Sequence, residues 1–182
     1  MASSPIDYDP KIDDTDNSTI FTANTPPDTI LGDFPDHNKS SGCPSVPWPG
    51  STFVIRSISS GQVITLNKGE VELGPESERA LGSSIHWACE EKRNWLGFMN
   101  VASGCFLGHQ GNRMFCNVKI HNEWENFCVR HTPEGGYILL VTRDKKLWKV
   151  GTEVVDGVEK LVRIEGEDEG TIWEFLKPKP KP

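Results

Sequence analysis

The sequence lacks long apolar runs and clusters of basic residues. Neither the N-terminus, MASSPIDYDPKIDD, nor any later stretch has the apolar segment of a signal peptide or the roughly 20 apolar residues that span a bilayer. Its basic residues are dispersed, whereas a nucleic-acid-binding face would need them clustered. These absences predict a cytoplasmic protein that binds neither membrane nor nucleic acid.

The chain has few cysteines, and their spacing matches neither a disulfide framework nor a metal site. The five cysteines, at positions 43, 89, 105, 116 and 128, are odd in number and do not follow the close spacing of a small disulfide-rich domain. The sequence contains no Cys-x-x-Cys and no His-x-x-x-His spacing, and the acidic run 165–169 lacks the alternating ligands of a calcium loop. We therefore expect reduced thiols, no metal and no cofactor.

The first fifty residues lack glutamate and nearly lack basic side chains. Residues 1–50 contain two basic residues, eight aspartates and eight of the 13 prolines, whereas residues 51–182 contain 17 basic and 18 acidic residues. A segment of this composition buries too little apolar surface to offset its ordering entropy. We predict a disordered acidic tail over 1–50, one β-trefoil domain over 51–177 and a polyproline II Lys-Pro stub over 178–182.

Apolar segments recur with a period of about 42 residues. Phe53, Trp95 and Tyr137 are each 42 residues apart, and each opens a segment typical of a strand: FVIRSI, WLGFMNV and YILLVT. A second apolar segment follows in each unit (QVITL, CFLGH, KLWKV), and each unit closes on an aromatic residue, at Trp87, Phe127 and Trp173. Alternation with period two places the closing aromatic residues, and Trp95, in the core.

Turn signals separate these segments. Asn67-Lys68-Gly69 predicts a three-residue hairpin loop, and Val155-Asp156-Gly157-Val158 predicts a type I′ turn. Residues 75–82, PESERALG, have helical character but form no more than a turn.

Three units of four strands make a twelve-stranded all-β domain, the arrangement of a β-trefoil with three pseudo-repeats. A four-bladed propeller would need a fourth unit, and a sandwich would not show threefold recurrence.

The segments Trp95-Leu96-Gly97, Ala102-Ser103-Gly104 and Phe106-Leu107-Gly108 resemble the strand–turn–strand signature of fascin-type β-trefoils. The core from about 53 to 177 is similar to single-domain fascin-like proteins of fungi. This resemblance implies a six-stranded barrel capped by three hairpins, and members that bind actin, sugars or proteins through exposed loops. Actin-bundling fascins carry four trefoils, whereas this chain has one. The Gln-x-Trp repeat of ricin-type sugar-binding trefoils is absent, which argues against a lectin of that type.

The glycines at 104, 108 and 111 lie between predicted strands. A phosphate-binding loop places its glycines ahead of a helix, and no helix follows here. We predict that Gly104 and Gly111 turn the chain and that Gly108 allows a neighbouring strand to approach closely.

The leading candidate binding site is the polar loop 117–125, NVKIHNEWE. It groups five side chains suited to polyol recognition, namely His121, Asn122, Glu123, Trp124 and Glu125. Trp148 joins them as a candidate, because it would point outward if Leu147 points inward. The alternative is an ordinary connection whose tryptophan packs into the barrel.

A catalytic role is less well supported by the sequence. Cys89 shares a strand face with Trp87 and is expected to be a buried, inert thiol. Cys128 lies near Arg130 and His131, but residues three apart on a strand face opposite sides, so they form no dyad. A cofactor-free isomerase or cyclase would have to bring the four outward ionisable candidates into one cleft, namely His86, Glu90, His109 and Arg130.

The sequence therefore favours a monomeric, non-catalytic module that binds a carbohydrate or a protein through exposed trefoil loops. The alternatives are the small-molecule enzyme on the same scaffold and a cytoplasmic protease inhibitor of the kind found in fungi.

Overall fold

The computed structural model describes residues 45–76, 83–164 and 170–178, all within one compact unit, Lys39–Pro182. The predicted tail up to residue 44, residues 77–82 of the predicted helical turn, the acidic run 165–169 and residues 179–182 of the stub lie outside the described residues. Among the residues described, no helix is long and apolar enough to cross a membrane.

The described residues form strands and one short 3-10 helix, as the all-β prediction requires. Twelve strands have five residues or more, and β4 has two. The elements are β1 (Thr52–Ser57), β2 (Val63–Asn67), β3 (Glu70–Gly74), β4 (Ser83–Ser84), β5 (Trp87–Lys92), β6 (Trp95–Asn100), β7 (Phe106–Gln110), β8 (Arg113–Val118), η1 (Glu123–Glu125), β9 (Phe127–His131), β10 (Tyr137–Arg143), β11 (Lys146–Val155), β12 (Val158–Ile164) and β13 (Ile172–Leu176).

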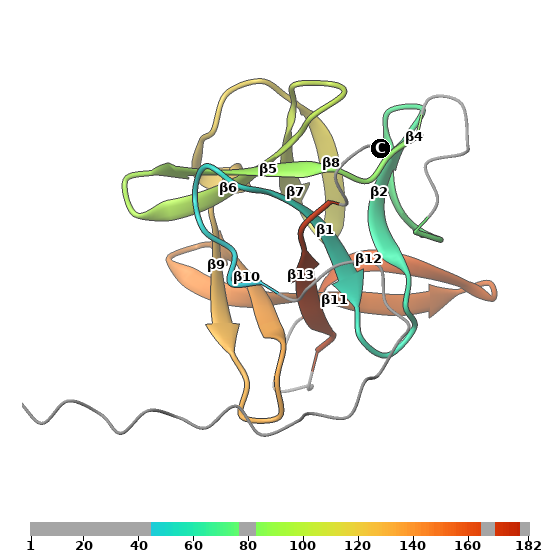
Figure 1. Ribbon diagram of the computed structural model, residues 1–182. Helices are drawn as coiled ribbons and strands as arrows, with labels where there is room; N and C mark the ends of the chain where they lie inside the picture. The colour runs from blue at the N-terminus through green and yellow to red at the C-terminus, as the bar shows by residue number, and fades with distance from the viewer. Residues whose placement is uncertain (1–44, 77–82, 165–169, 179–182) are drawn as a thin grey trace, which may run out of the picture. The chain divides into compact units, whose positions relative to one another are not determined.

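Six strands close into a ring, in which every pairing is antiparallel (Figure 1). β1 pairs with β13 and β5, β5 with β6, β6 with β9, β9 with β10, and β10 with β13. A closed ring leaves no unpaired strand edge within it. The predicted six-stranded barrel is therefore confirmed by the pairing pattern.

The remaining long strands form three hairpins, β2–β3, β7–β8 and β11–β12, which are joined to the ring. The type I′ turn predicted at 155–158 is confirmed, since Val155 pairs with Val158 and both intervening residues have positive φ. The loop at 67–69 is shorter than predicted. Asn67 belongs to β2 and pairs with Glu70, which leaves a two-residue turn.

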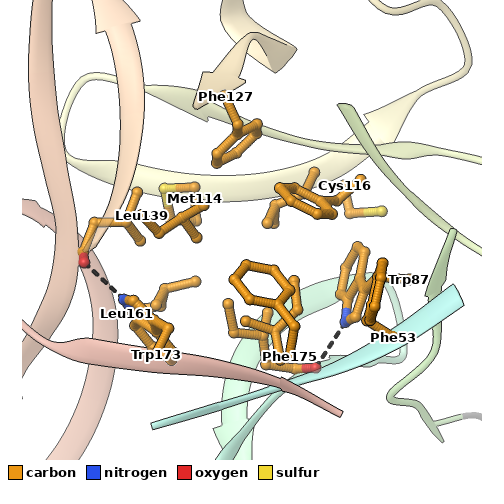
Figure 2. Close-up of a cluster of buried hydrophobic side chains, with 14 of the residues drawn as sticks. Phe53, Trp87, Met114, Cys116, Phe127, Leu139, Leu161, Trp173 and Phe175 are labelled. Carbon is orange, nitrogen blue, oxygen red and sulfur yellow. Dashed lines mark hydrogen bonds between the residues drawn. The ribbon is translucent and has the colours of Figure 1, made fainter. Parts of the chain in front are cut away.

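Aromatic side chains pack with aliphatic and sulfur-containing ones in the buried core (Figure 2). Phe53 packs edge-on against Phe175 with ring centroids 5.7 Å apart, and Phe98 lies 5.6 Å from Phe175 and 5.5 Å from Phe127. All four rings are fully buried. Such pairs add about 0.5–1.5 kcal/mol each beyond the burial of their area, so these contacts stabilise the ring from within.

Trp87 and Trp173 are fully buried, and both use their polar atom in the same way. The indole Nε1 of Trp87 donates to the carbonyl oxygen of Ile64 at 2.8 Å, and that of Trp173 donates to Val150 at 2.9 Å (Figure 2). Ile64 lies in the β2–β3 hairpin and Val150 in the β11–β12 hairpin. Each bond therefore ties a barrel strand to a hairpin.

The pairing register corrects the predicted place of Trp95. Phe53 lies opposite Trp87 and Tyr137 lies opposite Trp173, but the residue opposite Phe127 is Leu96. Trp95 is therefore one residue out of step with Phe53, and its side chain is only half-buried. The prediction that Trp95 is a core residue is wrong, because spacing along the chain misses a shift of one position between units.

The four described cysteines are free, as expected. Burial raises the pKa of Cys89 to about 12 and that of Cys116 to about 11. Burial also raises the pKa of Cys128, and this effect outweighs the opposing charge of Arg130. The basic neighbours of Cys128 therefore do not produce a reactive thiolate.

We predict that replacing Trp173 by phenylalanine lowers the free energy of unfolding by about 2 kcal/mol, because it leaves a buried carbonyl without its donor. Urea unfolding of Trp173→Phe and of the control Trp48→Phe checks this. Trp48 is 70% exposed, so its variant should match the wild type. Equal stability of both variants would contradict a structural role for the Trp173 hydrogen bond.

Candidate functional site

The short helix η1 carries the candidate Trp124 on its outer side. Trp124 is 53% exposed, so the alternative in which it packs into the barrel is wrong. The flanking residues His121 and Glu125 are only 5% and 2% exposed. Since they are buried, they support the site from beneath rather than presenting polar atoms to a ligand.

Two glycines of the sequence signature make this burial possible. A Cβ added to Gly97 would lie 2.8 Å from the His121 ring, and one added to Gly108 would lie 2.9 Å from Glu125 Oε1 and from the Phe115 ring. No real Cβ tolerates such approach without a shift of its neighbours. Gly108 thus allows close approach, as predicted, and Gly104 and Gly111 have the positive φ of turn residues.

The backbone of η1 is tied to its own flank and to β10. The Asn122 N–H donates to Glu125 Oε2 at 2.9 Å. From β10, Thr142 donates its hydroxyl to the carbonyl of Glu123 at 3.0 Å and its N–H to the carbonyl of Asn126 at 3.3 Å. These bonds hold the backbone on both sides of Trp124.

Between η1 and the β10–β11 hairpin lies a cleft of about 700 Å³, which we call the Trp124 cleft. It is lined by the aromatic rings of Trp95 and Trp124, by polar side chains including Gln110, Asn126 and Thr142, and by charged residues including Glu123, Arg143 and Lys146. Of the five candidates in the loop, Glu123 and Trp124 line this cleft, whereas His121, Asn122 and Glu125 do not.

His109 forms part of the cleft wall although it is 2% exposed. Its Nε2 lies 2.8 Å from the carbonyl oxygen of Thr142. A carbonyl only accepts, so Nε2 carries the hydrogen and Nδ1 is an acceptor, one without a partner among the described residues. Burial lowers the pKa of His109, and the charges of Arg163 and Arg143 lower it further.

The ionisable groups under η1 are also shifted by burial. Burial lowers the pKa of His121, and the neighbouring Lys92 ammonium lowers it further. Burial raises the pKa of Glu125, against the opposing effect of the Asn122 N–H that its carboxylate accepts. The His121 ring stacks on Phe106 with centroids 5.3 Å apart. The His121 and Glu125 side chains therefore pack beneath η1 as buried residues, although both are polar.

Trp148 lines a second cleft, of about 660 Å³, which we call the Trp148 cleft. The prediction that Leu147 points inward and Trp148 outward is wrong. Leu147 is 51% exposed, whereas Trp148 is half-buried and packs against the core. The register gives the reason, because Trp148 lies opposite the fully buried Val141 and Leu147 lies opposite Thr142.

Trp148 is held firmly in this position. Its indole Nε1 donates to the carbonyl oxygen of Arg143 at 3.3 Å, and the guanidinium of Arg163 lies over its ring, 4.7 Å from the centroid. Arg163 in turn donates to Asn112 Oδ1 at 2.9 Å.

Several residues of the Trp124 cleft were not predicted. The sequence spacing predicts Trp95 in the core and gives no signal for Gln110, Asn126, Thr142 or Asp144. The turn at Asp144-Lys145, where both residues have positive φ, contains no glycine and so lacks the usual hairpin signal. The three residues 143–145 that separate the segments YILLVT and KLWKV are the one sign of this hairpin in the sequence.

The four ionisable residues considered for catalysis are not brought together. His109 lines the Trp124 cleft and Arg130 lines the Trp148 cleft, whereas His86 and Glu90 line neither. Within the described part of the chain, no group of three or more His, Cys, Asp or Glu side chains could hold a metal ion.

Comparison with solved structures shows that the fold is shared with ricin B-like lectins of the β-trefoil type. One similar structure is the Macrolepiota procera ricin B-like lectin in complex with lactose, with a TM-score of 0.57, 14% identity, and 74% of this chain and 100% of that chain covered. Another is SeviL bound to asialo-GM1 saccharide, with a TM-score of 0.55, 15% identity, and 70% and 97% covered.

A third similar structure is the cytolethal distending toxin from Actinobacillus actinomycetemcomitans. Its TM-score is 0.58, at 15% identity with 74% of this chain and 95% of that chain covered. No protein-family model matches the sequence, and no curated protein matches it. At this level of identity the likeness shows the fold alone.

We predict that Gly97→Ala and Gly108→Ala each lower the free energy of unfolding by about 1–3 kcal/mol, because the added methyl group displaces buried side chains beneath η1. Gly74→Ala is the matched control, since a Cβ there would make an ordinary contact of 3.4 Å with Thr65. Chemical denaturation measures the difference. If all three variants lose the same free energy of unfolding, Gly97 and Gly108 are not specifically required for the packing beneath η1.

We also predict that stability falls as the pH drops below about 6.5, the usual histidine value. His109 and His121 have lowered pKa values when folded, so the unfolded chain takes up their protons at a higher pH than the folded chain does. The contribution of these two histidines to stability is therefore fully present above their pKa in the unfolded chain. It is lost as the pH falls towards their lower pKa in the folded chain. Urea unfolding across this range measures the slope.

The double variant His109→Gln/His121→Gln should show a shallower loss on acidification. The matched control is His131→Gln, because His131 is exposed on β9. A double variant with the wild-type slope would contradict the assignment of this pH dependence to His109 and His121.

Proposed function

We propose that the protein binds carbohydrate through the Trp124 cleft. The observation that carries this proposal is a half-exposed tryptophan, Trp124, facing a cleft of about 700 Å³ that also contains Trp95 and a set of hydrogen-bonding side chains. Sugars have apolar faces that stack on flat rings and hydroxyl groups that need donors and acceptors, so one cleft meets both requirements.

The polar groups of the cleft have the variety that a polyol needs. Asn126 and Gln110 provide amide donors and acceptors, Glu123 provides an acceptor and Arg143 provides donors. The ion pair of Arg143 with Asp144 spans 3.4 Å, and the two side chains are 39% and 81% exposed. Such an exposed pair is worth little, so Arg143 can be redirected to a ligand at small cost.

The similar solved structures support this reading, since two of the three were solved with lactose or a saccharide bound. The proposal does not transfer their binding sites, because the Gln-x-Trp repeat is absent here. It relies on the two aromatic residues that line the Trp124 cleft, namely Trp124 and Trp95.

The proposal also covers the internal repeat of the chain, its location in the cell and its boundaries. We infer three units of about 42 residues, supported by the recurring pairings of Phe53 with Trp87, Leu96 with Phe127 and Tyr137 with Trp173. The fascin-like resemblance, the cytoplasmic location, the monomeric state and the tail, domain and stub boundaries stay predictions. A non-catalytic role is favoured because neither cleft contains more than one of the four ionisable candidates.

We predict that a glycan array gives a positive signal with the wild-type protein and that Trp124→Ala weakens the strongest interaction at least tenfold, about 1.4 kcal/mol, because a central aromatic contact is lost. Titration calorimetry with the best glycan measures the change. An array without any signal would contradict the proposal and favour a protein partner, including a protease.

Trp48→Ala is the matched control. Trp48 is 70% exposed, more than Trp124, and it does not line the Trp124 cleft. Its loss should leave glycan binding unchanged. If both variants lost the same glycan affinity, the glycan would not bind specifically in the Trp124 cleft.

A further inference from the structure

Four hairpins in the described part of the chain turn through two residues that both have positive φ. The paired residues that flank these turns are Asn67 with Glu70, Lys92 with Trp95, Arg143 with Lys146, and Val155 with Val158. Glycine and asparagine adopt positive φ readily, whereas a long side chain such as lysine is strained there. In three of the turns the second residue is glycine or asparagine, namely Gly69, Asn94 and Gly157. In the β10–β11 turn it is Lys145, with a φ of 61°.

The β10–β11 turn is also the one of these four that lines a cleft. Asp144 and Lys145 both line the Trp124 cleft, and both are exposed. The central residues of the other three turns line neither the Trp124 cleft nor the Trp148 cleft. Backbone strain that glycine would relieve is typical of positions where a side chain has a function. The fold alone would favour glycine at position 145, so this coincidence indicates that the Lys145 side chain has a role in the cleft.

The strand that leads into the turn is fixed to η1. Thr142 donates its hydroxyl to the carbonyl of Glu123 at 3.0 Å and its N–H to the carbonyl of Asn126 at 3.3 Å. Glu123 and Asn126 lie on either side of Trp124 in the chain. Lys145 is three residues beyond Thr142, so the two Cα atoms are within about 11 Å of each other. Trp124 and Lys145 are therefore carried by elements that are bonded to each other.

The two side chains of the turn offer complementary hydrogen-bonding groups. The Lys145 ammonium has three donors and no acceptor, whereas the Asp144 carboxylate only accepts. Asp144 pairs with Arg143 at 3.4 Å, but the Asp144 side chain is 81% exposed, so its carboxylate remains open to a ligand. A donor beside an acceptor matches two neighbouring hydroxyl groups of a sugar, since one hydroxyl accepts while the other donates.

We propose that Lys145 determines the specificity of the Trp124 cleft. Its ammonium donates to one of two neighbouring hydroxyl groups of a neutral sugar that stacks on Trp124, and Asp144 accepts from the other. This inference rests on the carbohydrate-binding function proposed above. The long side chain of lysine reaches a hydroxyl group that glycine or asparagine at the same position would not reach. The turn thus gives up some stability and gains a donor in the cleft.

The test replaces Lys145 by asparagine and by glycine. Both residues suit positive φ, so the midpoint of thermal unfolding should rise by about 2–4 °C as the strain is relieved. Titration calorimetry uses the neutral glycan that gives the strongest array signal. The affinity for this glycan should fall about five- to tenfold, because a charged donor is lost. A residue with a purely structural role would not gain stability and lose affinity together.

Lys68→Asn is the matched control. Lys68 is an exposed lysine with a φ of 50° in the β2–β3 turn, and it lines neither cleft. Its variant should also gain thermal stability, but its affinity for the same glycan should equal that of the wild type. Equal losses of affinity in Lys68→Asn and Lys145→Asn would overturn the inference, because the loss would then follow from removing a positive charge anywhere on the surface.

Deoxy derivatives of the same glycan test the contact itself. In each derivative, hydrogen replaces one hydroxyl group. The wild type should bind one of the derivatives at least about fivefold more weakly than the parent glycan. Lys145→Asn should bind that derivative and the parent equally well, because its donor is already absent. If every derivative weakens binding by the same factor in the wild type and in Lys145→Asn, Lys145 contacts no hydroxyl group and the inference is wrong.

The failures of the two proposals are distinguishable. An array with no glycan signal at all removes the carbohydrate-binding function and this contact with it. A positive array, with binding that is weakened by Trp124→Ala but is unchanged in Lys145→Asn and Lys145→Gly, overturns the role of Lys145 alone.

Discussion

The structure depends on a closed ring of six strands that is filled by aromatic side chains. Phe53, Phe98, Phe127 and Phe175 pack against one another inside it, and Trp87 and Trp173 carry their polar atoms into hydrogen bonds with two hairpins. A buried indole N–H without an acceptor would cost about 1–3 kcal/mol. The two tryptophans therefore both fill the barrel and join it to the β2–β3 and β11–β12 hairpins.

This constraint also holds the walls of the proposed binding cleft in place. β9 and β10 are members of the ring, and η1 immediately precedes β9, so the cleft is bounded by elements that the core holds in place (Figure 1). Thr142 ties η1 to β10, and Gly97 and Gly108 make room for His121 and Glu125 beneath it. A site prepared in this way loses less entropy on binding than a free loop would.

Much of the fold could be predicted, because the barrel strands are patterned by burial with period two. Trp87, Phe127 and Trp173 were correctly placed in the core for that reason. The errors arose where register depends on partners distant in the chain. Trp95 was placed in the core because a shift of one residue between units is invisible to spacing. Trp148 was placed outside because its orientation follows from its opposition to Val141.

The candidate site was only half predictable, and the reason lies in η1. The five residues from His121 to Glu125 were treated as one exposed loop, but a 3-10 turn has about three residues per turn, so neighbours along it face different directions. Trp124 faces the cleft, whereas Glu125 and His121 face the barrel. The opposite wall, formed by the β10–β11 hairpin, could not be identified, since its turn uses Asp144 and Lys145 in place of glycine.

The two candidate tryptophans, Trp124 and Trp148, are held by different means. Trp148 is fixed through its side chain, by the carbonyl of Arg143 and the guanidinium of Arg163. Trp124 is positioned through the backbone of η1, which Thr142 anchors, and its side chain is 53% exposed. Of the two rings, Trp124 is therefore the one that a ligand can reach more fully, because Trp148 is packed against the core and has the Arg163 guanidinium over its ring.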